Sequence, residues 1–270
     1  MSSHFERNDR KRPRDANRAP DKKPHKNNPV SRDKAPANDW LWGFHAIEAA
    51  LNNPARPAPK RVLATPDRAK RLTEQYGLKG IEVVDAQLIA RQVPQGAVHQ
   101  GMAMRIDPPE PLSVAELGEN PSGLIVMLDQ ITDPQNVGAI FRSAAAFGAR
   151  GIILQDRHSP ALAGAAAKAA VGAIDRLPHA MAVNLSRALE QLAEMGWRAV
   201  GLDGSATETL DKALDGSPTV LVMGSEGDGI RRLVAEHCDV LAKIPMPGGM
   251  ESLNVSNAAA VALYEASRPR

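Results

Sequence analysis

The sequence contains little that would support a disulfide, a membrane span or a secretion signal. Its 270 residues include one cysteine, Cys238, which excludes an internal disulfide framework and a zinc site built on several cysteines. One cysteine also suits the reducing environment of the cytoplasm. No apolar run approaches the ~20 residues that a membrane-spanning helix needs, and the N-terminus lacks the apolar core of a signal peptide. We therefore expect a cytoplasmic protein with no membrane partner.

The formal charge is also small, at +2, but it is unevenly distributed. Residues 1–38 hold 11 Lys/Arg against 5 Asp/Glu, a net of +6, whereas residues 39–270 hold 22 against 26, a net of −4. The basic tail contains five prolines and few large apolar groups, so it is predicted to be disordered. Such a tail either binds nucleic acid by neutralising phosphates or acts as a solubilising extension, and its charge leaves both open.

The rest of the chain divides into two α/β units. In the first, residues 39–106, the apolar spacing from Trp40 to Leu51 predicts a helix. Further strands are predicted at 60–65, 80–85 and 99–106, and further helices at 67–77 and 86–94. Residues 107–121, with four prolines, read as a linker.

From residue 122 the strands become longer and more continuously apolar. They are predicted at 124–129, 151–155, 198–203, 219–224 and 240–246, and the helices between and after them at 135–148, 160–170, 184–196, 230–237 and 252–267. This alternation predicts an α/β fold with a mainly parallel sheet covered on both faces. Ligands of such sheets bind beyond the carboxyl ends of the strands, where three polar stretches lie here.

The first stretch, "TDPQNVGAIFR" (132–142), follows the first of these strands. Asn136 is near the predicted helix start, and Arg142 follows it by six residues. An arginine on an otherwise apolar helix needs a partner, and Asp129 and Asp133 are the nearest carboxylates in sequence.

The second stretch, "GSEGDG" (224–229), resembles a dinucleotide-binding loop but has the wrong spacing, G-x-x-G-x-G in place of G-x-G-x-x-G. Glu226 would also repel a pyrophosphate, so NAD is excluded. A neutral or cationic cofactor fits better. The alternative is a simple turn in which Asp228 caps the next helix.

The third stretch, "IPMPGGMESLNVSNAAAVALYEA" (244–266), places Ser252 and Asn254 between a Pro/Gly loop and an apolar helix. Helix capping alone would explain a Ser-x-Asn pair. The alternative is that the loop and helix start hold a ligand.

Together, and in this order, the stretches resemble the SpoU (TrmH-like) family of RNA ribose 2′-O-methyltransferases in the SPOUT superfamily. The resemblance rests on 129–148, 223–229 and 244–266 and spans residues 122–270. "WGFHAIEAAL" (42–51) and "GAVHQGMA" (96–103) are similar to the RNA-binding domain of the RlmB-type branch, which methylates a guanosine of 23S ribosomal RNA.

The resemblance implies an enzyme that uses S-adenosylmethionine and needs no metal. It also implies a deep trefoil knot within 122–270 and an RNA substrate-binding domain at 39–106. The positions that match cofactor contacts are Gly224, Ile244, Met246 and Leu253. The positions that match the family's polar active site are Asn136, Arg142, Glu226, Ser252 and Asn254. In the family, Arg142 is the proposed base or hydroxyl activator, although arginine is nearly always protonated.

We therefore expect methyl transfer to a ribose 2′-hydroxyl in 23S ribosomal RNA. The alternatives are a transfer RNA ribose methyltransferase and a non-catalytic RNA-binding protein of ribosome assembly. The resemblance further implies a homodimer. The last helix is consistent with a homodimer, because its residues Val255 to Leu263 offer more apolar surface than one-sided packing requires. The alternative is that all of this surface packs within one chain.

Overall fold

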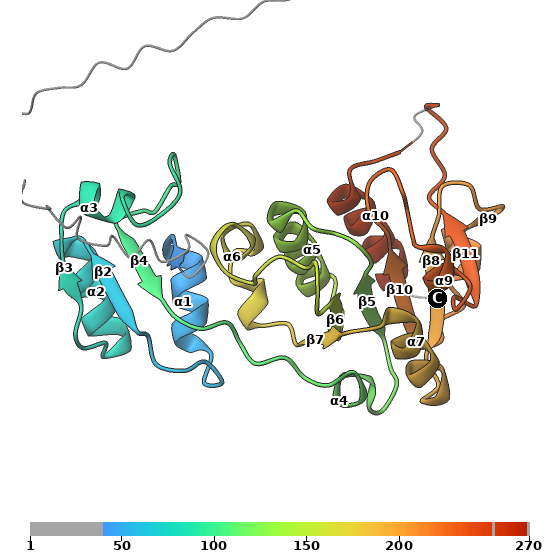
Figure 1. The fold of residues 1–270 in the computed structure, drawn as a ribbon, viewed down its shortest axis with the longest axis horizontal. Helices are drawn as coiled ribbons and strands as arrows, with labels where there is room; N and C mark the ends of the chain where they lie inside the picture. The colour runs from blue at the N-terminus through green and yellow to red at the C-terminus, as the bar shows by residue number, and fades with distance from the viewer. Residues whose placement is uncertain (1–39, 250–251, 269–270) are drawn as a thin grey trace, which may run out of the picture. The chain divides into compact units, whose positions relative to one another are not determined.

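The computed structural model describes residues 40–249 and 252–268, which form two β-sheets covered by helices (Figure 1). All of these residues belong to one compact unit. The basic tail 1–38, with its predicted disorder, lies outside the described residues. None of the helices in the described ranges is long and apolar enough to cross a membrane.

The N-terminal sheet has the strand order β1-β4-β2-β3. Its strands are β1 (Trp40–Trp42), β2 (Arg61–Ala64), β3 (Glu82–Val83) and β4 (Met102–Arg105), and its helices are α1 (Phe44–Asn52), α2 (Pro66–Tyr76) and α3 (Ala86–Ala90). β4 pairs antiparallel with β1 and β2, and β3 pairs parallel with β2. We refer to residues 40–106 as the N-terminal lobe.

The start of this lobe corrects one prediction. Trp40 and Leu41 belong to strand β1 and not to a helix, and all three residues of the strand are buried. Gly43 has φ 84°, a conformation that glycine adopts without strain, and this lets the chain leave the strand and begin α1 at Phe44. α2 ends as predicted, at Gly77, whose left-handed backbone donates to the Thr73 carbonyl.

The C-terminal sheet has seven strands in the order β7-β6-β5-β10-β8-β11-β9, and every pairing is parallel. Its strands are β5 (Leu124–Leu128), β6 (Gly151–Gln155), β7 (His179–Ala182), β8 (Arg198–Leu202), β9 (Glu208–Thr209), β10 (Thr219–Met223) and β11 (Val240–Lys243). The predicted parallel sheet is confirmed. β7 and β9 were not predicted, because both are short edge strands without a long apolar run. The trefoil knot stays a prediction.

Helices cover both faces of this sheet. α5 (Pro134–Ala146), α6 (Gly164–Ala170), α8 (Leu210–Ala213) and α10 (Val255–Ser267) contribute to one core, and α4 (Val114–Gly118), α7 (Leu185–Glu194) and α9 (Arg232–Ala235) to the other. Successive side chains of strand β5 point to opposite faces of the sheet. Leu124, Val126 and Leu128 enter the first core, while Ile125 and Met127 enter the second. A short 3-10 helix, η2 (Ala173–Asp175), follows α6.

The linker predicted at 107–121 contains helix α4. Ser113 caps it by accepting from the Glu116 backbone N–H, and the Glu116 carboxylate accepts from the Ser113 N–H, which forms a capping box. The indole N–H of Trp197 donates to the Gly118 carbonyl at 2.8 Å. These bonds fix the linker to one face of the sheet.

The last helix, α10, packs mainly within the chain. Val255, Ala259, Ala262 and Leu263 are buried in the first core, so these apolar residues do not form a free surface. The exposed apolar side chains of the helix are instead Val261 and Tyr264, at 43% and 57%.

Candidate functional site

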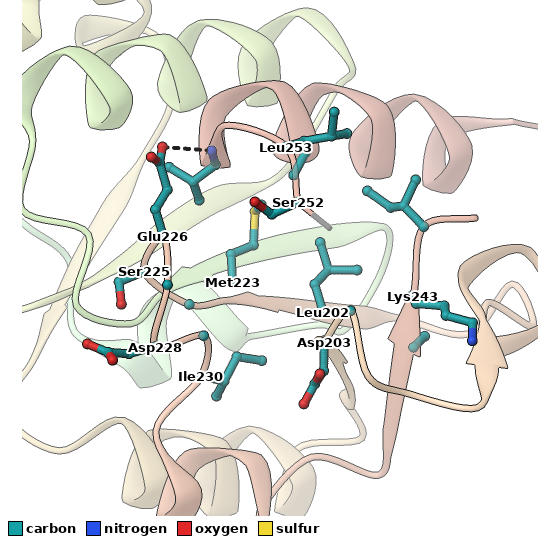
Figure 2. A pocket seen from close by; sticks show the side chains of 18 of the residues that line it. Leu202, Asp203, Met223, Ser225, Glu226, Asp228, Ile230, Lys243, Ser252 and Leu253 are labelled. Carbon is teal, nitrogen blue, oxygen red and sulfur yellow. Dashed lines mark hydrogen bonds between the residues drawn. The ribbon is translucent and has the colours of Figure 1, made fainter. Parts of the chain in front are cut away.

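A cavity of about 480 Å³ lies at the carboxyl ends of β8, β10 and β11 (Figure 2). Residues from the segments 202–204, 223–230, 242–246 and 252–258 line it. This edge is the one at which parallel sheets bind ligands, because the loops after neighbouring strands diverge there. The second and third polar stretches of the sequence therefore meet in one place.

The four residues predicted to contact a cofactor all line this cavity: Gly224, Ile244, Met246 and Leu253. Glu226 and Ser252, predicted as active-site residues, line it as well. Apolar side chains such as Met223 and Leu202 lie between charged ones in the close view (Figure 2). The cavity can therefore bind a ligand with both apolar and polar parts.

The glycine loop after β10 is a tight, closed turn. Ser225 and Gly229 exchange two backbone hydrogen bonds, both 3.1 Å long. A Cβ at Gly224 would overlap the backbone of Gly229 and Ile230, so no other residue fits there without movement of the loop. The loop thus presents backbone to the cavity.

The carboxylate of Asp129, at the end of β5, holds the start of α9. It is fully buried and accepts from both the backbone N–H and the Nε of Arg231, each at 2.8 Å. The N-cap residue of α9 is Arg231, so the interpretation of Asp228 as its cap is wrong. The suggested pairing of Arg142 with Asp129 or Asp133 is also wrong, because Asp133 caps α5 through the Gln135 N–H.

Three predicted polar residues, one from each stretch, meet at the start of α10. Glu226 Oε1 accepts from Asn254 Nδ2 at 2.6 Å, from the Val255 N–H at 3.0 Å and from Asn136 Nδ2 at 3.4 Å. Asn254 Nδ2 also donates to Asn136 Oδ1 at 3.1 Å. We call Asn136, Glu226 and Asn254 the polar cluster.

Asn254 caps its helix, which confirms one explanation of the Ser-x-Asn pair, whereas the ligand-binding explanation stays a prediction. Its Oδ1 caps α10 by accepting from the Ser256 N–H at 3.0 Å, while its Nδ2 joins the polar cluster. Glu226 accepts the hydrogen bonds of the polar cluster through only one of its carboxylate oxygens, Oε1. Within the described residues, Oε2 of Glu226 receives no hydrogen bond, and the side chain is exposed at the rim of the cavity.

Arg142 does not join the polar cluster within one chain. It lies on α5, more than one helical turn beyond Asn136, and its side chain is exposed. It lines a different cavity, of about 400 Å³, together with Val171 and Arg176. Any part that Arg142 plays at the cluster therefore needs a second chain or a movement.

Sequence reasoning missed one wall of the 480 Å³ cavity. Leu202, Asp203 and Gly204, at the end of β8, line it, and Asp203 Oδ1 is held by the N–H and hydroxyl of Ser205 at 2.8 and 2.7 Å. The signal was available, since an acidic residue directly after an apolar parallel strand marks the ligand-binding edge.

Metal-ligating groups and the single cysteine are further candidate chemical sites. Among residues 40–249 and 252–268, no three His, Cys, Asp or Glu side chains are grouped to hold a metal. Burial, with smaller effects of Asp239 and Asp129, raises the pKa of the Cys238 thiol to about 12. Cys238 is therefore protonated at neutral pH and is a poor nucleophile.

Two family models match separate parts of the chain. Residues 123–264 match the SpoU rRNA Methylase family. Residues 40–112 match the family described as RNA 2′-O ribose methyltransferase substrate binding.

Similar proteins carry related descriptions. The chain is 44% identical over 213 residues to a tRNA/rRNA methyltransferase of Mycobacterium avium (strain 104), which covers 74% of this chain and 68% of the relative. It is 39% identical over 246 residues to a tRNA/rRNA methyltransferase of Mycolicibacterium smegmatis, with 88% and 78% covered.

Solved structures share the fold. The SpoU methyltransferase AviRb from Streptomyces viridochromogenes, in complex with the cofactor AdoMet, has a TM-score of 0.71 at 24% identity and covers 86% of this chain and 89% of its own. The AdoMet-bound rRNA methyltransferase from Sinorhizobium meliloti has a TM-score of 0.72 at 23% identity, with 85% and 87% covered.

Proposed function

The chain belongs to the SpoU rRNA Methylase family of RNA methyltransferases, and from this we propose that it methylates a ribose 2′-hydroxyl of RNA. In the proposal the methyl donor is S-adenosylmethionine and the target is a guanosine of 23S ribosomal RNA. One observation carries it: the residues that match the family's cofactor positions line a single cavity, and the polar cluster stands at its rim.

The cavity fits this cofactor in size and charge. Its volume of about 480 Å³ lies within the range of small-molecule sites. Among the residues that the structure describes, three carboxylates, those of Asp203, Glu226 and Asp228, line it against one lysine, Lys243. This balance suits a cationic sulfonium better than an anionic dinucleotide. When bound, S-adenosylmethionine supplies a methyl group already activated by the sulfonium charge.

The chain's own residues must orient the ribose hydroxyl and ease the loss of its proton. Glu226 is held in place by three donors on Oε1, so its orientation is fixed before substrate arrives. The other oxygen, Oε2, can accept a hydrogen bond from the ribose hydroxyl. Alignment of that kind supplies a large part of the rate in group-transfer reactions.

The proposal includes a homodimer, in which Arg142 of one copy reaches the polar cluster of the other. Two observations support it. Arg142 lies away from the cluster of its own chain, and α10 leaves Val261 and Tyr264 exposed at 43% and 57%, where a second copy can cover them. Arg142 would then contact an RNA phosphate or the reacting ribose, as the family resemblance implies.

The N-terminal lobe favours ribosomal RNA over the alternatives. It matches the substrate-binding family of RNA ribose methyltransferases, and a simple transfer RNA enzyme would not need it. A non-catalytic assembly protein would not need the polar cluster. Both alternatives are outcomes of the test below.

The test is methyl transfer by the purified full chain from labelled S-adenosylmethionine to 23S ribosomal RNA and, separately, to bulk transfer RNA. Mapping of 2′-O-methyl marks should place the label on one guanosine of 23S RNA. Label in transfer RNA alone would refute the ribosomal target. Cofactor and RNA binding without transfer to either RNA would favour the non-catalytic alternative.

A further inference from the structure

The segment from α6 to η2, residues 164–176, packs directly against the N-terminal lobe. Gly172 has φ 87°, and a Cβ at this position would lie 2.6 Å from the Cβ of Ala49 and 3.1 Å from the carbonyl oxygen of His45. The backbone of the segment therefore touches helix α1. Groups that the segment exposes lie at the junction of the lobe and the C-terminal sheet.

Lys168 on this segment carries a charge that no carboxylate of the described chain neutralises. It is half-buried in the last turn of α6, and its Nζ lies against Gly43 at the entrance to α1. No ion pair joins it to any residue within 40–249 and 252–268. The helix C-terminus offsets part of the charge, and the rest can attract an anionic ligand.

The lobe side of this junction holds another cation. Phe44 begins α1, and its N–H donates to the side-chain oxygen of Gln100 at 2.9 Å. The guanidinium of Arg71 lies over the Phe44 ring, 4.1 Å from its centroid. Arg71 is thereby fixed near the start of α1, the helix against which Lys168 packs.

The other end of the segment opens into the cavity of about 400 Å³ that Arg142 and Arg176 line. Among the described residues, no acidic side chain lines this cavity. Asp175, the neighbour of Arg176 in sequence, is buried in an ion pair with Arg56 and faces away from solvent. Both arginines are exposed and can take up an anion.

We propose that Lys168 and Arg176 bind phosphates of the RNA backbone where it passes from the N-terminal lobe to the C-terminal sheet. Arg71 extends this phosphate path on the lobe side, and Arg142 extends it on the other side, at the cavity that it lines with Arg176. This inference rests on the proposed function, since it assigns a path to the RNA of that reaction. Cations without carboxylate partners on both sides of one junction can bind phosphodiester groups. Neither Lys168 nor Arg176 lines the cofactor cavity, so their role is separate from cofactor binding.

The test compares RNA affinity over a range of salt for Lys168→Gln, Arg176→Gln and the double variant. Filter binding with 23S ribosomal RNA, from roughly 50 to 200 mM salt, gives the affinity and its salt dependence. Each single variant should weaken binding roughly threefold to tenfold and lower the slope of log affinity against log salt by about 1. Lys168→Arg should restore most of the affinity.

The matched control is Arg187→Gln on α7, an exposed arginine on the opposite face of the sheet. It removes the same charge and should leave affinity and slope nearly unchanged. Equal effects of the control and the junction variants, or no effect of either, would overturn the proposal. Calorimetric binding of S-adenosylhomocysteine and thermal unfolding show that each variant is folded.

The outcomes also separate this inference from the proposed function. If the wild-type chain binds RNA and transfers methyl groups while the junction variants bind as wild type, only the phosphate path is wrong. If the wild-type chain neither binds 23S RNA nor methylates it, the proposed function fails and the path fails with it.

Discussion

The guanidinium of Arg56 and the carboxylate of Asp175 form a two-point ion pair between positions 119 residues apart in sequence. Nε lies 2.6 Å from Oδ1 and Nη2 lies 3.1 Å from Oδ2, and the two side chains are only 1% and 4% exposed. Asn53 Nδ2 also donates to Oδ1, at 3.1 Å. The pair joins the N-terminal lobe to η2, directly beside Arg176.

Asp175→Asn should therefore destabilise the protein strongly. It leaves the Arg56 guanidinium buried without a counter-charge, which costs about 3–5 kcal/mol in comparable cases. The control is Asp107→Asn, which breaks an ion pair with Lys60 whose side chains are 55% and 53% exposed. That change should cost about 1 kcal/mol or less. Urea unfolding measures the free energy of unfolding of both variants. Equal losses would show that the buried ion pair contributes no more to stability than the exposed one.

His179 should make the protein less stable in acid. Burial, and secondly the charge of Arg56, lowers the pKa of His179 to about 4, from an ordinary value near 6.5. Between these values the unfolded chain binds the proton and the folded chain does not, so stability falls as pH drops through this window. The linkage amounts to about 2 kcal/mol at pH 5 relative to pH 8.

The measurement is urea unfolding of the wild type and of His179→Gln at pH 8 and pH 5. The variant should lose about 2 kcal/mol less than the wild type between the two pH values, whatever its absolute stability. Parallel losses in both proteins would mean that His179 titrates normally in the folded state.

Gly224→Ala should weaken cofactor binding strongly. The added Cβ would overlap the backbone of Gly229 and Ile230, so the loop that walls the cavity has to move. We expect affinity for S-adenosylhomocysteine to fall roughly tenfold or more, measured by calorimetry. Gly248→Ala is the control, because nothing lies within 4 Å of its added Cβ. Wild-type affinity of the Gly224 variant would place the cofactor elsewhere.

Mixing two inactive variants tests whether Arg142 acts across a dimer. Arg142→Ala and Glu226→Gln should each lose methyl transfer by about 100-fold or more. If the site combines two copies, an exchanged equimolar mixture should regain about a quarter of wild-type activity, because half of the dimers carry one intact site. No recovery, with subunit exchange verified, would place Arg142 at its own chain's cluster or outside the reaction.

Val261→Arg should yield a soluble monomer. Val261 is 43% exposed on α10, and a charged side chain there would prevent a second copy from covering the helix. The sedimentation coefficient, measured by sedimentation velocity, and the methyl-transfer activity should decline together. Val183→Arg, at a valine that is 79% exposed before α7 on the other face, should stay dimeric and active. An active monomer of the Val261 variant would refute the composite site.

Much of the C-terminal fold could be predicted, because its strands are continuous apolar runs. β5, β6, β8, β10 and β11 begin at their predicted residues and end within three residues of their predicted ends, and the parallel pairing follows from the helices between them. Strand β1 could not be predicted from spacing. Three apolar residues before Gly43 fit a strand or a helix equally well, and only the pairing with β4 decides between them.

The candidate site divides in the same way. The positions of the polar stretches at strand ends were sufficient to predict that Gly224, Glu226 and Ile244 lie close together, since parallel strands share one carboxyl edge. In the structure these three residues line one cavity. The side-chain partners could not be read from spacing. Asp129 precedes Arg142 by 13 residues, yet it binds Arg231, because helix phase turns Arg142 away from the strand end.

By itself, then, the sequence determined the parallel sheet, the edge where ligands bind and the residue types at that edge, all of which follow from local apolar periodicity and motif order. Only the tertiary structure decided that Glu226 accepts hydrogen bonds from Asn136 and Asn254, and that Arg56 is neutralised by Asp175. These contacts join residues far apart in the chain, and their geometry depends on helix phase and on how the two sheets' helices pack, which no local pattern encodes.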